Sequence, residues 1–250
     1  HKDSRFNKRF RLKLNLENQT IIIFVYKSNI MATKPKVEKN LSKIDIITYY
    51  MDHVLEHEHI PRSVYKFAKD NKFEEKDFYK YFGNFQALRE DIWESFFDNA
   101  HSLMNQNEEV ANYGSREKML TFFFTFFEIL TANRSYVLYV LEENEDQLKN
   151  LKQLKGLRRN IKSFAKELIE DDNDEKSYSF LKRNESIYSE AAWIQFLFLL
   201  KFWKDDKSAD FEKTDVAIEK SVNTIFDVLD NTPLEKVFDF GKFIYKETMK

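Results

Sequence analysis

Five lysines recur every three or four residues between positions 66 and 80, namely Lys66, Lys69, Lys72, Lys76 and Lys80. Side chains three and four positions apart share one face of a helix, so this spacing predicts a local basic ridge able to contact phosphates. The same segment contains the sequence FEEKD at residues 73–77, whose three carboxylates repel phosphates. The lysines therefore remain either a nucleic-acid contact or a set of solvated surface charges.

A second group with potential chemistry is the sequence DHVLEHEH at residues 52–59. His53 and His57 are four apart on a predicted helix, a spacing that can hold a metal ion. The order of residues differs from the metalloprotease pattern, so we interpret the group as solvated surface charge and predict no metal site. No Ser–His–Asp set, paired carboxylates or Gly-rich phosphate loop is recognisable from spacing, and the chain has no cysteine. We predict no catalytic residues, no cofactor and no enzyme activity.

The elements that carry these residues are predicted to be helices. The 250 residues include only 4 Gly and 3 Pro but 25 Phe, a composition typical of long, packed helices. Ser42, with Asp45 three positions on, predicts the N-cap of a first helix, and Ser63 that of a short second helix. Asn71-Lys72 predicts the turn into a third helix, which ends at Gly83.

The remainder of the chain predicts a larger set of helices. A long helix follows Asn84, and others are predicted over residues 116–131, 134–142, 147–170, 189–203, 211–230 and 234–249, with a solvated loop at 171–177. The run TFFFTFFEIL is apolar nearly all round, so its helix must be central in its domain. The last helix has an apolar face beside lysines; it either docks on its own domain or lies on a membrane.

Charge and hydropathy exclude several classes of protein. Lys plus Arg total 40 and Asp plus Glu total 42, which argues against nucleic-acid binding through bulk charge. No stretch has transmembrane length without charges, and the absence of cysteine fits a reducing compartment. We expect a cytoplasmic protein with no integral membrane segment. The basic residues 1–30 contain no Met and precede Met31, so we interpret them as a leader that is not native or is disordered.

The order of short motifs between residues 43 and 90 is more specific. An apolar helix is followed without a gap by Ser63-Val64, Phe67-Ala68, the sequence FYKYF at 78–82, and Asn84 with Ala87-Leu88. This pattern resembles the TetR family of bacterial transcriptional regulators. The later part of the chain agrees with that family only in the number and order of its helices.

The resemblance implies an all-α, TetR-like fold with an N-terminal three-helix helix-turn-helix domain (31–83) and a C-terminal helical ligand-binding and dimerisation domain (84–250). It implies a homodimer, formed through helices near 189–203 and 211–230, that binds palindromic duplex DNA and responds to a small apolar or lipid-like ligand. The implied DNA contacts are Arg62, Ser63, Lys72, Lys76, Tyr79, Lys80 and Tyr81. The implied ligand contacts are Phe123, Phe126, Phe127, Tyr139, Trp193 and Phe196, although core packing alone also explains these residues.

Departures from the family pattern keep a second function open. Lys72 stands where the family has a turn glycine, and a left-handed backbone there would cost about 1 kcal/mol unless Asn71 takes up the turn. Residues 43–90 carry eight cations against nine acids. The alternative is a TetR-fold protein without DNA binding that binds a lipid or quinone-like molecule, or a partner protein. The operator, the ligand and the direction of regulation remain open.

Overall fold

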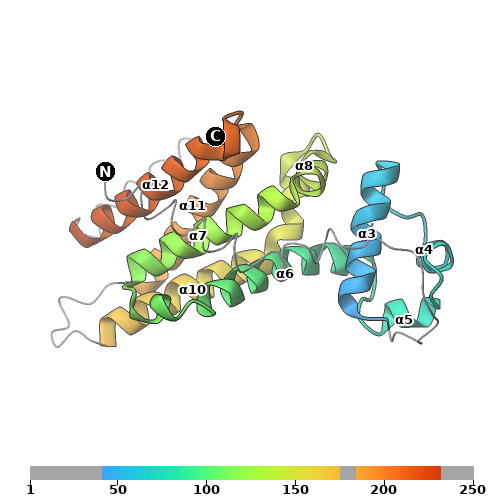
Figure 1. Cartoon of the computed structure of the whole chain (residues 1–250), viewed down its shortest axis with the longest axis horizontal. Helices are drawn as coiled ribbons and strands as arrows, with labels where there is room; N and C mark the ends of the chain where they lie inside the picture. The colour runs from blue at the N-terminus through green and yellow to red at the C-terminus, as the bar shows by residue number, and fades with distance from the viewer. Residues whose placement is uncertain (1–40, 175–183, 232–250) are drawn as a thin grey trace. The chain divides into compact units, whose positions relative to one another are not determined.

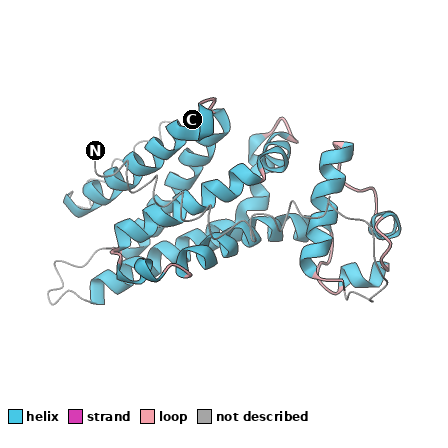
Figure 2. Cartoon of the chain, viewed as in Figure 1, coloured by secondary structure: helices cyan, strands magenta, loops and turns pink. Residues whose placement is uncertain are grey.

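The structure is a computed structural model that describes residues 41–174 and 184–231. Within these ranges every regular element is a helix (Figure 2). The elements are α3 (Lys43–His57), α4 (Val64–Asp70), α5 (Glu75–Tyr79), α6 (Phe85–Asn105), η2 (Glu108–Asn112), α7 (Ser115–Ala132), α8 (Arg134–Glu142), α9 (Gln147–Leu151), η3 (Lys152–Leu154), α10 (Lys155–Asp174), α11 (Glu185–Asp205), η5 (Ala209–Phe211) and α12 (Glu212–Asn231). The predicted leader and the predicted helix over 234–249 lie outside the described residues.

These helices form two compact units. In the described part of the chain, the first unit consists of residues 41–85 together with Ala132–Tyr139. The second consists of Gln86–Thr131 and the residues from Val140 onward. The helix α8 therefore contributes its first turns to one unit and its last residues to the other.

The first unit contains α3, α4 and α5 around a small aromatic core. The predicted cap of α3 is confirmed: the amide of Asp45 donates to the Ser42 hydroxyl at 3.1 Å, and the Asp45 carboxylate accepts from the Ser42 amide at 2.9 Å. Such a capping box satisfies two of the free amides at a helix start. The core beneath is made by the rings of Tyr50, Phe67, Phe78 and Phe85, whose centroids lie 5.3–6.4 Å apart.

The second unit is built around α7, α10, α11 and α12 (Figure 1). As its sequence predicts, α7 is buried on nearly every face, including all five of its phenylalanines. The helix α11 packs against both α10 and α12. The Trp203 indole of α11 is buried and donates to the Thr131 hydroxyl at 2.9 Å, which satisfies its one polar atom.

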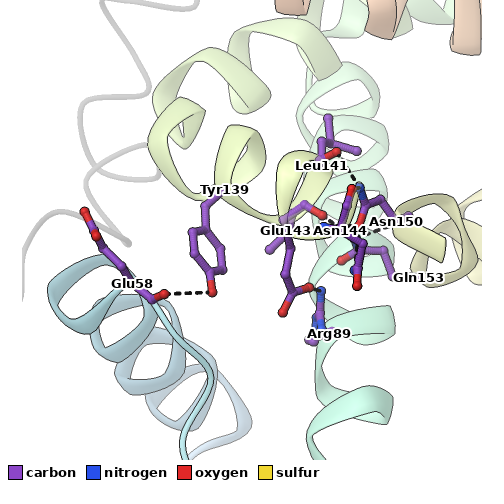
Figure 3. Close-up of polar contacts among 9 residues, drawn as sticks. Glu58, Arg89, Tyr139, Leu141, Glu143, Asn144, Asn150 and Gln153 are labelled. Carbon is purple, nitrogen blue, oxygen red and sulfur yellow. Dashed lines mark hydrogen bonds and ion pairs between the residues drawn. The ribbon is translucent and has the colours of Figure 1, made fainter. Parts of the chain in front are cut away.

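The single helix predicted over 147–170 is wrong, because the structure has α9, then η3, then α10. Buried amide side chains explain the break (Figure 3). The Asn150 side chain donates to the carbonyl oxygens of Leu141 and Asn144 at 2.9 and 2.8 Å, and that of Gln153 donates to Val140 at 3.1 Å. These bonds fix η3 under the end of α8. Residues 171–174 of the predicted loop are helical instead, since α10 continues to Asp174, and the rest of that predicted loop lies outside the described residues.

A buried carboxylate joins α11 to α12. Asp206 follows α11, and its two oxygens accept from the amide and hydroxyl of Ser208 at 2.8 and 2.7 Å and from the amide and hydroxyl of Thr214 at 2.9 and 2.7 Å. Burial raises the pKa of Asp206, but these four hydrogen bonds outweigh burial and lower the pKa to about 2. The carboxylate therefore fixes the turn between the two helices.

Two further features of the described residues bear on function. No helix among them is long and apolar enough to cross a bilayer. Within the same ranges, no group of three or more His, Asp or Glu side chains is arranged to hold a metal ion. The rings of His53 and His57 stack face to face, with centroids 4.3 Å apart.

Candidate nucleic-acid interface

The second and third helices, α4 and α5, are joined by a tight turn at Asn71–Lys72. The N-cap predicted at Ser63 is confirmed, since its hydroxyl accepts from the Lys66 amide at 3.2 Å. At the other end of α4, the amide of Phe73 donates to the Ala68 carbonyl at 3.0 Å and the amide of Lys72 donates to Lys69 at 3.2 Å. This pair of bonds is a Schellman motif, in which the residue after the cap is left-handed.

Lys72 is that left-handed residue, with φ at 60°, whereas Asn71 has φ at −96°. Asn71 therefore does not take up the turn. Instead its side chain donates to the Phe67 carbonyl at 2.9 Å and supports the helix end. A lysine in this conformation carries a strain of about 1–2 kcal/mol that glycine would avoid. The contact of Phe73 with Phe67, at 5.6 Å between centroids, completes the motif and holds the turn closed.

The orientation of α5 follows from Phe78, which is fully buried among the rings of Phe67 and Phe85. Because α5 has one buried side, its other side chains are exposed or half-buried. All seven residues implied as DNA contacts are exposed: Arg62, Ser63, Lys72, Lys76, Tyr79, Lys80 and Tyr81. The first unit thus presents them on the surface of α4, the turn and α5.

Carboxylates of the same segment bind the cations of α5. Lys76 pairs with Glu74 at 2.6 Å, and Lys80 pairs with Asp77 at 2.6 Å. The hydrogen bond to Glu74, with its charge, raises the pKa of Lys76, and the hydrogen bond from Lys80 lowers the pKa of Asp77. The carboxylates of FEEKD therefore neutralise neighbouring lysines. A DNA phosphate would have to displace these carboxylates before it could pair with the same lysines.

The exposed tyrosines also have partners. The Tyr79 hydroxyl donates to Glu75 at 3.3 Å, and the pKa of Tyr79 is raised first by partial burial and then by the Glu75 charge. The Tyr81 hydroxyl donates to the Leu41 carbonyl at 2.9 Å and so ties the end of α5 to the start of α3. Tyr81 and Ser63 thus already serve the fold of this unit.

The residues implied as ligand contacts are divided between the two units. Phe123, Phe126, Phe127 and Phe196 are buried in the second unit. The rings of Phe126, Phe127 and Phe196 pack against one another, and Trp193 stacks on Phe196 at 5.4 Å. Tyr139 belongs to the first unit. Its hydroxyl donates at 3.2 Å to the carbonyl of Glu58, the left-handed residue that ends α3 (Figure 3). In the second unit, Arg89 of α6 forms an ion pair with Glu143, which follows α8.

The structure also reveals an open groove in the second unit that sequence analysis missed. Its volume is about 390 Å³, and its floor is formed by Met104, Val110, Phe164 and Leu168. The Phe164 ring lies 4.8 Å from that of Phe122, within the aromatic core. Apolar periodicity could not identify this groove because its walls come from α6, η2, α7 and α10.

The helix α11 has apolar residues on both its buried and its exposed faces. Phe196 and Leu199 are fully buried within the single chain. The outward apolar residues are Ile194, 65% exposed, and Phe198, 52% exposed. The spacing of four between them was the available signal, but the neighbouring apolar residues on other faces of α11 concealed it.

The described residues form an all-α protein with a small unit that contains the α4–turn–α5 arrangement and a second, larger helical unit. Residues 118–244 match a family model described as the tetracyclin repressor-like C-terminal domain. This match covers half of the chain, and the chain belongs to the TetR family of transcriptional regulators. Comparison with curated proteins and with solved structures gave no match.

Proposed function

We propose that the protein is a ligand-responsive transcriptional regulator that binds palindromic DNA as a homodimer. The observation that carries this proposal is the closed α4–turn–α5 unit, on which all seven implied contact residues are exposed. Lys72 adds support, because a strained non-glycine residue persists where its side chain has a use. A helix-turn-helix dimer reads two half-sites about one helical turn apart, which is why a palindrome is expected.

The dimer is proposed to form through α11 and α12. Ile194 and Phe198 form an exposed apolar stripe on α11, and a groove of about 600 Å³ runs from Phe198 and Phe202 to Lys213 of α12. A second copy would cover this stripe. Phe198→Lys is expected to convert a dimer to a monomer in analytical ultracentrifugation, with unchanged helical circular dichroism. Leu148→Lys is the matched control, because Leu148 is an apolar residue that is 74% exposed on a different helix, α9.

The ligand is proposed to reach the aromatic core of the second unit. Phe123, Phe126, Phe127 and Phe196 fill that core, so a ligand must displace side chains rather than enter a preformed space. The groove beside Phe164 offers the entry, since the Phe164 ring separates it from Phe122. The apolar core behind Phe164, rather than the partly polar groove itself, suits an apolar or lipid-like molecule.

The decisive test is selection of duplex DNA from a random library by the full chain near physiological salt, after its oligomeric state is measured in the same buffer. Enrichment of a palindrome supports the proposal and gives the half-site spacing. A dimer that enriches no sequence contradicts it, provided that protein refolded free of small molecules behaves in the same way.

A second candidate is a TetR-fold protein that has lost DNA binding and binds a lipid, a quinone-like molecule or a partner protein. The ion pairs of Lys76 with Glu74 and of Lys80 with Asp77 favour it, because they remove two cations from the surface that would face phosphates. Mass spectrometry of protein purified under native conditions tests this candidate. A co-purified apolar molecule together with no enriched DNA would support it.

A further inference from the structure

Glu74 and Lys76 form an exposed ion pair at the start of α5. Both side chains are 69% exposed, and their charged atoms lie 2.6 Å apart. Glu74 is the N-cap of α5, yet its carboxylate makes no capping hydrogen bond. The two carboxylates within α5 accept from residues later in the chain, Glu75 from Tyr79 and Asp77 from Lys80. Glu74 and Lys76 therefore present an acceptor and a donor side by side to solvent.

This arrangement matches the edge of one base pair in the major groove. A C·G pair presents the cytosine N4 amino donor beside the guanine O6 and N7 acceptors. A carboxylate accepts from the cytosine amino group, and an ammonium donates to the guanine. The other base pairs fit less well: an A·T pair presents an amino group and O4 with a methyl, but lacks the two adjacent acceptors that attract lysine.

The position of the pair on the fold agrees with base contact rather than phosphate contact. The first residues of the second helix of a helix-turn-helix lie closest to base edges. A lone carboxylate there would repel the flanking phosphates, but the ammonium of Lys76 neutralises Glu74 at 2.6 Å. The Glu74 carboxylate, which weakens non-specific binding, would then contribute to base recognition.

We infer that Glu74 and Lys76 together read a C·G base pair in each half-site, Glu74 on the cytosine and Lys76 on the guanine. This inference rests on the proposed DNA binding and adds the base that the site selects. On this inference the acidic residues of the contact surface select a base pair, and they do not indicate that DNA binding has been lost.

The test is selection of DNA from a random duplex library by the full chain and by three variants, with base preference at each position as the readout. Glu74→Gln is expected to change the preference at one position of each half-site from C to A, because an amide pairs with adenine N6 and N7. Discrimination of C at that position should fall by about 5- to 150-fold. Lys76→Met should relax the preference at the same base pair. Glu56→Gln is the matched control, because it removes one exposed carboxylate of α3 in the same unit.

The outcomes separate this inference from the function on which it rests. If the wild-type dimer enriches no sequence, both fail. If it enriches a palindrome and Glu74→Gln enriches the same one, DNA binding stands and base reading by Glu74 is overturned. If Lys76→Met weakens binding uniformly without changing any base preference, Lys76 contacts phosphate. The inference that Glu74 and Lys76 recognise one base pair together is then wrong. A change confined to one base pair in both variants, and absent in Glu56→Gln, supports the inference.

Discussion

Replacing Lys72 by glycine separates the stability of the helix-turn-helix from its charge. In the native turn Lys72 has φ at 60°, and a lysine in this region costs about 1–2 kcal/mol relative to a residue without a Cβ. Glycine removes that strain but adds about 0.5–1 kcal/mol of unfolded-chain entropy. The two bonds of the Schellman motif are made by backbone atoms and survive the change. We therefore expect a net stabilisation of about 0.5–1 kcal/mol.

The assay must report on the first unit alone, and the three tryptophans, Trp93, Trp193 and Trp203, all lie in the second unit. Native-state hydrogen exchange meets this need, because the Phe73 amide donates to Ala68 across the turn. A gain of 0.5–1 kcal/mol should slow its exchange by about 2- to 5-fold. Lys72→Arg is the control, since it keeps both the left-handed residue and the charge and should leave exchange unchanged.

The same variant should weaken DNA binding. Loss of one phosphate contact lowers the slope of log K against log salt by about 0.9 and costs about 5-fold in affinity at 0.15 M salt. Lys72→Gly is thus expected to be more stable and to bind less tightly. Unchanged exchange at Phe73 would refute the assignment of strain to Lys72, and an unchanged salt slope would refute its contact with phosphate.

Two further predictions concern titratable groups. Asp206→Asn should destabilise the second unit by about 2 kcal/mol, the equivalent of lowering the pKa from 3.8 to about 2, as measured by urea unfolding followed by tryptophan fluorescence. In the wild type this contribution is present above pH about 4 and should be lost as the pH falls from 4 towards 2; a flat profile there would contradict it. Burial, with smaller effects of His57 and His59, lowers the pKa of His53, so the first unit should lose stability as the pH falls below about 6.5. His53→Gln should reduce this loss, and hydrogen exchange of α3 at pH 5 and 8 checks it.

The helix boundaries could be predicted where local chemistry decides them. Ser42 with Asp45, and Ser63, were recognisable as caps because their partners lie within three residues. The break after α9 could not be predicted in this way. Asn150 and Gln153 donate to carbonyl oxygens 9 and 13 residues earlier, and a polar residue in a helical pattern gives no sign of such partners. Only the packing of α8 over this segment makes these bonds possible.

The faces of the apolar helices were harder to predict than the helices themselves. The sequence of α11 is apolar on several sides, so periodicity could not separate the buried Phe196 from the exposed Phe198. Tyr139 is a related case, because an aromatic residue on α8 fits a ligand cavity as well as it fits a hydrogen bond to the end of α3. In both cases the outcome depends on which neighbouring element packs against the helix.

The paired charges of α5 bear on how any DNA would be bound. A lysine that already holds a carboxylate has released its counterions, so exchanging that carboxylate for a phosphate yields little of the salt-dependent free energy that supports non-specific binding. Lys76 and Lys80 are both in this state. Binding must then rely on the remaining cations, chiefly Arg62 and Lys72, and on contacts with base edges. A salt slope smaller than the number of exposed lysines, together with strong base preference, is the behaviour that this surface predicts.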